Sequence, residues 1–175
     1  MENLEFIFVQ LIGAIGYALL SMSYFRKKKI QILYMQIIAN TFFVMHYFLL
    51  DGITGAISNV FGLITFTAIY YFDKKKLGKQ KNILALFMII LLFIAVIYAY
   101  QDIYSLLPFI AFTLAIISFL TNNEDKIRKF GIVVAICWLV YAIVCGSYAA
   151  IVFEVITLVS TIAALIKNPA NKNKE

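Results

Sequence analysis

Few polar side chains interrupt the long apolar stretches of this 175-residue chain, and those few could carry its chemistry. Glu154 is the one carboxyl group placed well inside such a stretch. Burying a charge is costly unless it is paired, so a carboxyl in this position needs an explanation. It can carry a proton or hydrogen-bond a polar ligand, and we expect a function of this kind. A neutral carboxyl that bonds His46, Asn59 or a backbone carbonyl for structural reasons is the alternative.

A repeated spacing connects Glu154 with three other residues. Asn59 lies 95 positions before Glu154, and Phe43 lies 95 positions before Trp138. Aromatic rings can stack on a ligand, and amide or carboxyl groups can hydrogen-bond it. We therefore predict that these four side chains surround one binding site. In the alternative interpretation the two aromatic residues are core packing, and Asn59 cross-links helices.

Three more residues are candidates for the same site. Asn40 lies one helical turn before Phe43, and His46 and Tyr141 are again 95 positions apart. Asn40 could instead cross-link helices, and His46 could be a hydrogen-bonded packing residue near the membrane surface. The predicted substrate-binding residues are Phe43, Asn59, Trp138, Glu154, His46, Asn40 and Tyr141.

The composition of the chain indicates a membrane protein. It is 63% hydrophobic, with a mean hydropathy of +0.93. A bilayer core about 30 Å thick is crossed by a helix of about 20 apolar residues. We predict an all-α membrane protein with seven transmembrane helices, and no Lys or Arg within them that could pair with Glu154. The predicted spans are 4–24, 30–50, 53–72, 82–100, 105–120, 127–145 and 148–166.

The distribution of charge predicts the topology. All 15 Lys and Arg residues lie in four clusters, at 26–29, 74–81, 126–129 and 167–174, which alternate with gaps that contain none. Short loops rich in Lys and Arg stay on the cytoplasmic side. We expect a multi-pass membrane protein with its N-terminus outside and its C-terminus in the cytoplasm. The net charge of +6 then indicates contact with the lipid bilayer, not a nucleic-acid partner.

The spacing of 95 also predicts two repeats. Helix ends, turns and charge clusters share this register, so we expect three-helix repeats at 1–72 and 104–167. A unit of three spans ends on the opposite side from its start, so a parallel second unit needs one extra crossing. A loop and linker helix at 73–103 would supply it, giving a 3+1+3 arrangement with a cytoplasmic tail at 168–175. Transporters with parallel repeats bind substrate near the midplane between the halves.

Two residues at equivalent positions could allow motion. Pro108 removes a helix hydrogen bond and favours a kink, and Gly13 lies 95 positions earlier. We predict hinges at Gly13 and Pro108, although Pro108 could simply begin its helix.

Several site classes have no candidate residues. Cys137 and Cys145 lie about 12 Å apart along one helix, which is too far for a disulfide bond. One histidine and two cysteines supply no cluster with metal-ligand spacing. No nucleophile–base pair is visible, so we expect no enzymatic activity, no metal and no cofactor.

Short segments spread over nearly the whole chain match a known family: Gln10–Gly13, His46–Gly52, Gly55–Asn59, Leu106–Pro108, Cys137–Val140, and Gly146-Ser147 followed by Glu154. In these segments the chain resembles the YgjV-type bacterial inner membrane proteins. An Arg that the family pattern would carry is replaced by Gly62. The resemblance implies a multi-pass protein of the bacterial plasma (inner) membrane.

A wider resemblance connects the chain with the SWEET and PQ-loop transporters. It rests on the 3+1+3 plan and on an aromatic residue followed by Asn in each half, where Trp138 and Asn59 match and Phe43 and Glu154 differ. The Pro-Gln dipeptide is missing, since Phe109 follows Pro108 and Gly13 replaces the other proline. The resemblance implies a transporter or facilitator of a small polar molecule such as a sugar, amino acid or vitamin. The alternative is a non-transporting membrane protein: a sensor, an assembly factor or a lipid-binding module.

Overall fold

The computed structural model describes residues 3–121 and 123–167, and the described chain is helical. Seven helices are long and apolar enough to cross a membrane, which confirms the predicted spans. α4 and α6 begin three or four residues earlier than predicted, because helices continue beyond their apolar residues into polar ones. The predicted tail at 168–175 lies outside the described residues. The helices are α1 (Asn3–Tyr24), α2 (Lys29–Leu49), α3 (Ile53–Lys74), α4 (Gly78–Tyr98), α5 (Leu106–Leu120, preceded by the 3-10 turn Ile103–Ser105), α6 (Glu124–Val144) and α7 (Tyr148–Lys167).

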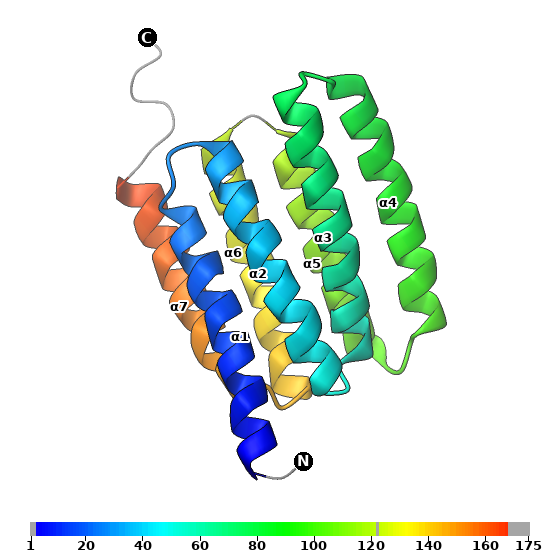
Figure 1. Cartoon of the computed structure of the whole chain (residues 1–175), viewed down its shortest axis with the longest axis vertical. Coiled ribbons are helices and arrows are strands. Elements are labelled where there is room, and N and C mark those ends of the chain that lie inside the picture. The colour runs from blue at the N-terminus through cyan, green and yellow to red at the C-terminus, as the bar shows by residue number, and fades with distance from the viewer. Residues whose placement is uncertain (1–2, 122, 168–175) are drawn as a thin grey trace.

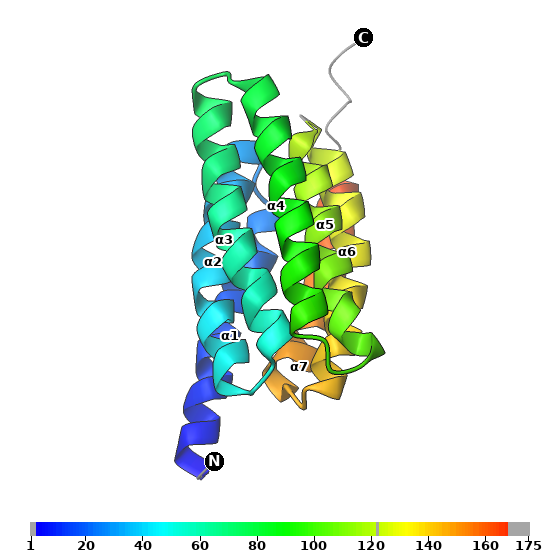
Figure 2. The same ribbon diagram turned by 90° about the vertical axis from the view of Figure 1, so that its right-hand side faces the viewer.

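Six helices form a closed ring, and α4 lies outside it (Figure 1). Around the ring the order of neighbours is α1, α2, α3, α5, α6 and α7, with α7 packed against α1. α4 contacts α3 and α5, as the rotated view of Figure 2 also shows. Side chains of all six ring helices can therefore meet at the centre of the bundle, and those of α4 cannot.

The helices direct polar side chains inward and apolar ones outward. Asn40, Asn59 and Glu154 are buried, whereas Leu86, Ile90 and other large apolar residues of α4 are exposed. A lipid environment favours this distribution. Apolar side chains can contact lipid tails without a cost in free energy, whereas a polar group in the same place would have no hydrogen-bond partner.

The two ends of the bundle differ in charge. The segments 26–29, 74–81 and 126–129 and Lys167 all lie at one end, here called the basic end (Figure 1). At the opposite end, two tight turns connect α2 to α3 and α6 to α7. Each uses a left-handed residue, Asp51 with φ of 57° and Gly146 with φ of 65°. Glycine adopts this conformation without strain, and Asp tolerates it.

Neither predicted hinge interrupts a helix. Gly13 lies within the continuous helix α1, and a Cβ atom there would come 2.7 Å from the ring of His46. Its missing side chain thus lets α2 approach α1 closely. Pro108 is the third residue of α5, where the backbone nitrogen needs no helical partner. The hinge roles remain a prediction.

Candidate functional site

An internal cavity of about 50 Å³ lies at the centre of the helix ring. All six ring helices contribute to its lining, and α4 contributes none. Phe43, Asn59, Trp138 and Glu154 all line it, although they come from four different helices. The structure therefore brings together the four residues that polarity and spacing had selected, while their binding role remains a prediction.

These four residues occupy matching positions along their helices. Asn59 is the seventh residue of α3 and Glu154 the seventh of α7. Phe43 is the fifteenth residue of α2 and Trp138 the fifteenth of α6. Asn59 and Glu154 therefore lie at the same depth in the bundle. Each is on the helix that directly follows the one carrying its aromatic neighbour, Phe43 or Trp138.

Glu154 is the least satisfied polar group of the cavity. Its side chain is 1% exposed, and its Oε2 atom has no hydrogen-bond partner among the described residues. The Tyr17 hydroxyl, which also lies 3.0 Å from the Tyr47 hydroxyl, interacts with this carboxyl. A buried acceptor without a donor reduces stability by about 1 to 3 kcal/mol. Binding of a ligand, a proton or a water to this carboxyl would remove that penalty.

Two asparagines of the cavity use their N–H groups within their own helices. The Nδ2 atom of Asn59 donates to Gly55 O at 2.8 Å, and that of Asn40 donates to Gln36 O at 2.7 Å. These bonds do not cross-link helices, so they do not support the structural alternative for the two residues. They leave the carbonyl oxygen and the second N–H of each side chain for other partners.

Aromatic rings separate the cavity from the end opposite the basic end. Trp138 lies 5.2 Å from Tyr47 and 5.8 Å from Tyr141 between ring centroids. The Tyr141 hydroxyl bonds Thr54 Oγ1 at 2.9 Å and accepts from Gly55 N at 3.0 Å. Tyr141 therefore closes this end between α6 and α3 and does not itself line the cavity.

His46 also lies outside the cavity. Its Nδ1 atom is 2.9 Å from Val9 O, which can only accept, and its Nε2 atom is 2.7 Å from Ser147 Oγ. A neutral ring that donates from Nδ1 and accepts at Nε2 satisfies both contacts. The structure thus places His46 as a buried link between α1, α2 and the start of α7, which is the structural role left open by the sequence.

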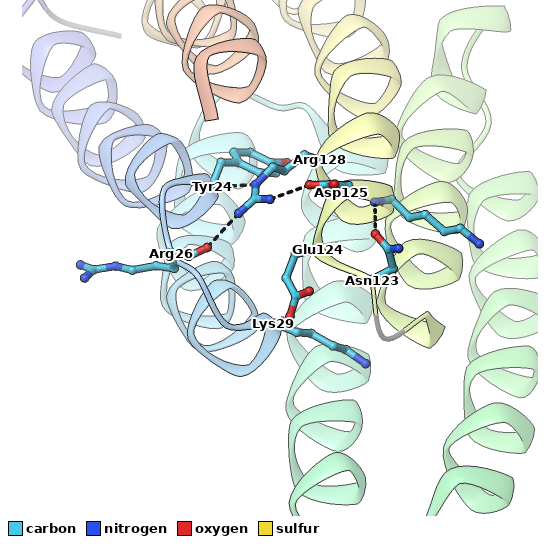
Figure 3. Close-up of polar contacts among 8 residues, drawn as sticks. Tyr24, Arg26, Lys29, Asn123, Glu124, Asp125 and Arg128 are labelled. Carbon is cyan, nitrogen blue, oxygen red and sulfur yellow. Dashed lines mark hydrogen bonds and ion pairs between the residues drawn. The ribbon is translucent and has the colours of Figure 1, made fainter. Parts of the chain in front are cut away.

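Arg128 is a buried cation that the sequence interpretation missed. It belongs to the basic cluster 126–129, which overlaps the start of the predicted span 127–145, and it lies within α6. The expectation that the spans contain no Lys or Arg is therefore wrong. Its guanidinium is 1% exposed and bonds Tyr24 O, Arg26 O and Asp125 Oδ1 at 3.0 to 3.2 Å (Figure 3). The fork of five N–H donors can reach all three acceptors at once. Arg128 therefore ties the start of α6 to the end of α1 at the basic end.

Asp73 forms a second buried cluster at the same end. It pairs with Lys29 and with Lys81, each at 2.7 Å, and so joins α2, α3 and α4. The Lys29 amide in turn donates to Glu124 Oε1 at 3.2 Å, and the two residues lie close together in Figure 3. A single acid at the start of a basic segment was the signal in the sequence, since three lysines, 74–76, follow Asp73 directly. Within 3–121 and 123–167, no group of three His, Cys, Asp or Glu residues could hold a metal ion.

Comparison with known proteins places the chain in a family. The family model for bacterial inner membrane proteins of the YgjV type (Imp-YgjV) matches residues 7–172, which is nearly the whole chain. No curated protein and no solved structure matches. Together with seven candidate membrane spans, this match identifies an integral, multi-pass inner membrane protein. The chain belongs to the YgjV family of bacterial inner membrane proteins.

Proposed function

We propose that this protein is a transporter or facilitator of a small polar molecule across the bacterial inner membrane. One observation carries the proposal: the unpartnered Glu154 oxygen in a central cavity that six spanning helices enclose. Ionisable groups in membrane spans are costly and commonly mark substrate or ion pathways. The proposal includes no enzymatic step.

The cavity lining supports the two three-helix repeats. Sixteen of the 22 lining residues form eight pairs separated by 95 positions. Lys29 and Glu124, which contact each other, are also 95 positions apart. Two residues at equivalent positions of two repeats can touch only near the axis that relates the repeats, so this contact fits the proposed symmetry. The eight pairs are Tyr17/Phe112, Leu20/Ala115, Tyr24/Phe119, Gln36/Gly131, Ala39/Val134, Asn40/Ala135, Phe43/Trp138 and Asn59/Glu154.

Local geometry repeats with the same spacing. The left-handed residues Asp51 and Gly146 are 95 positions apart. The Ser23 hydroxyl donates to Leu20 O at 2.6 Å, and the Ser118 hydroxyl, 95 positions later, donates to Ala115 O at 2.7 Å. Two units of like structure can rock against each other about a site between them.

In the proposed cycle, the conformation seen here is one in which aromatic residues close both ends of the cavity. A volume of about 50 Å³ accepts roughly three or four water-sized groups, so a sugar or an amino acid would need a wider state. Tyr47 and Trp138 lie toward one end, and Tyr24, whose carbonyl bonds Arg128, lies toward the basic end. In the proposed cycle these two closures open alternately.

A cysteine in the cavity tests alternating access without knowledge of the substrate. Ala135 lines the cavity, so Ala135→Cys is made in a background where Cys137 and Cys145 are serine. A small membrane-impermeant thiol reagent is applied from each side of oriented membrane vesicles, and labelling is measured by mass. We expect labelling from both sides, because each closure opens in turn.

Ala85→Cys is the matched control, because Ala85 is fully buried on α4 and does not line the cavity. It should stay unlabelled under the same conditions. If Ala135→Cys is as unreactive as this control from both sides, a non-transporting membrane protein is the better assignment.

A further inference from the structure

The lining of the cavity combines one acidic side chain with many aromatic rings. Among the described residues that line it, none is Lys, Arg or His, and Glu154 is the one acidic side chain. Eight of the 22 lining residues are aromatic. Because the face of an aromatic ring carries partial negative charge, such rings attract cations within about 6 Å of the ring centre. Both features favour a positively charged ligand.

The hydrogen-bonding groups of the cavity have the same preference. One N–H of each of Asn40 and Asn59 is used within its own helix, and the Tyr17 and Tyr47 hydroxyls bond each other. The Glu154 Oε2 atom has no partner among the described residues. The side-chain oxygens of Glu154, Asn59 and Asn40 are left as acceptors, so a ligand that bonds them must bring donors. The second N–H of each asparagine and the indole N–H of Trp138 are among the donors of the lining. Anions and ligands that only accept hydrogen bonds would leave these oxygens unsatisfied.

Size narrows the ligand further. The closed cavity of about 50 Å³ has room for roughly three or four water-sized groups. A guanidinium ion has four heavy atoms and carries N–H donors around a planar charged centre. An ammonium group on a short alkyl chain is comparable. A bare metal ion would leave the aromatic surface unused.

We propose that the substrate class is a small organic cation with N–H donors, an alkylammonium or guanidinium compound. Its charge pairs with the Glu154 carboxylate, and its N–H groups bond the side-chain oxygens of Asn59 and Asn40. Phe43 and Trp138 pack against its remaining surface. The proposal rests on the transport function proposed above and names the ligand of the same cavity.

Guanidinium and urea form a matched pair of probes, because they share planar shape and differ in charge. Binding to the purified protein is measured by titration calorimetry at constant ionic strength. We expect guanidinium to bind and urea to bind at least about tenfold more weakly, as the loss of one partner of a buried charge pair implies. Glu154→Gln should weaken guanidinium binding by a similar factor and leave urea binding unchanged. Glu5→Gln makes the same chemical change at an exposed site and should have no effect.

A positional swap separates charge recognition from damage to the fold. Glu154→Asn alone should abolish guanidinium binding. Adding Asn59→Glu returns one carboxyl to the cavity at the same depth, and the double variant should bind guanidinium again. Loss of binding in Glu154→Asn without rescue in the double variant contradicts charge pairing, provided that both variants unfold at the wild-type temperature. Equal binding of urea and guanidinium, or no binding of either, also overturns the proposal.

Uptake of labelled guanidinium and urea into proteoliposomes separates this inference from the proposed function. Guanidinium that binds and is not taken up refutes transport and leaves cation recognition standing. Uptake of a neutral compound at equal rates by wild type and Glu154→Gln supports transport and refutes cation recognition. Uptake of guanidinium that depends on Glu154 supports both.

Discussion

Hydrogen-bond satisfaction separates two buried polar residues that looked alike in the sequence. Both ring nitrogens of His46 have partners, Val9 O and Ser147 Oγ, so the ring completes a structural link. Glu154 has an oxygen without a hydrogen-bond partner in the part of the chain that the structure describes, and its side chain lines the cavity. The sequence could select both residues by rarity. Their different roles depend on what surrounds each side chain, which one-dimensional spacing does not contain.

His46→Phe tests the structural role at this scale. The ring volume stays while both hydrogen bonds are lost, so we expect the free energy of unfolding to fall by about 1 to 3 kcal/mol. Guanidinium binding should be unchanged, because the ring lies outside the cavity. Thermal unfolding and calorimetry of the purified protein measure the two quantities. Ser147→Ala should cost less in the His46→Phe background than in the wild type, since the two residues are bonded partners. If His46→Phe instead bound guanidinium more weakly and kept the stability of the wild type, His46 would be a binding residue and not a structural one.

At the scale of elements, buried ion pairs hold helix ends that hydropathy assigns to loops. Arg128 bonds one backbone carbonyl at the end of α1 and one in the segment that follows it, and Asp73 joins lysines of α2 and α4. Fixed partners at the basic end define how α1, α2 and α6 meet next to the cavity. In the sequence, these charged residues indicated only the topology, because the number of Lys and Arg residues in a segment does not show which of them form hydrogen bonds or ion pairs in the folded protein. The positions of the helices could be predicted from the lengths of the apolar stretches. The ion pairs and hydrogen bonds that connect the helix ends could not.

Arg128→Ala is expected to destabilise the protein strongly. It leaves two carbonyls and Asp125 without their buried donor, and removing one partner of a buried pair costs about 3 kcal/mol or more. Arg128→Lys should recover part of the loss, because an ammonium keeps the charge and lacks the planar fork. Lys129→Ala is the matched control, since it removes the same charge from the adjacent exposed position. Thermal unfolding in detergent compares the three variants. An equal midpoint for Arg128→Ala and Lys129→Ala would show that the buried contacts contribute nothing.

At the scale of the whole molecule, one spacing accounted for much of the site. The offset of 95 residues linked Phe43 to Trp138 and Asn59 to Glu154 before any coordinates, and all four line the cavity. A spacing carries this information when each repeat keeps the same helix lengths and turns, so that equal sequence positions reach equal depth. It does not predict the enclosed volume, which depends on how large side chains such as Phe112 fill the centre. The same offset placed His46 and Tyr141 at equivalent positions, yet both lie outside the cavity.

The orientation of the molecule in the membrane is the last prediction. The structure gathers the basic segments at one end, and short loops rich in Lys and Arg remain in the cytoplasm. In the background without native cysteines, Lys76→Cys should therefore resist an impermeant thiol reagent applied to intact cells. Asp102→Cys, in the segment between α4 and α5 at the opposite end, should react. Both positions lie in turns that the structure leaves exposed, so permeabilised cells should label the two variants equally and serve as the control. Labelling of Lys76→Cys alone in intact cells would invert the topology, and with it the side of the membrane toward which the proposed closure at Tyr24 opens.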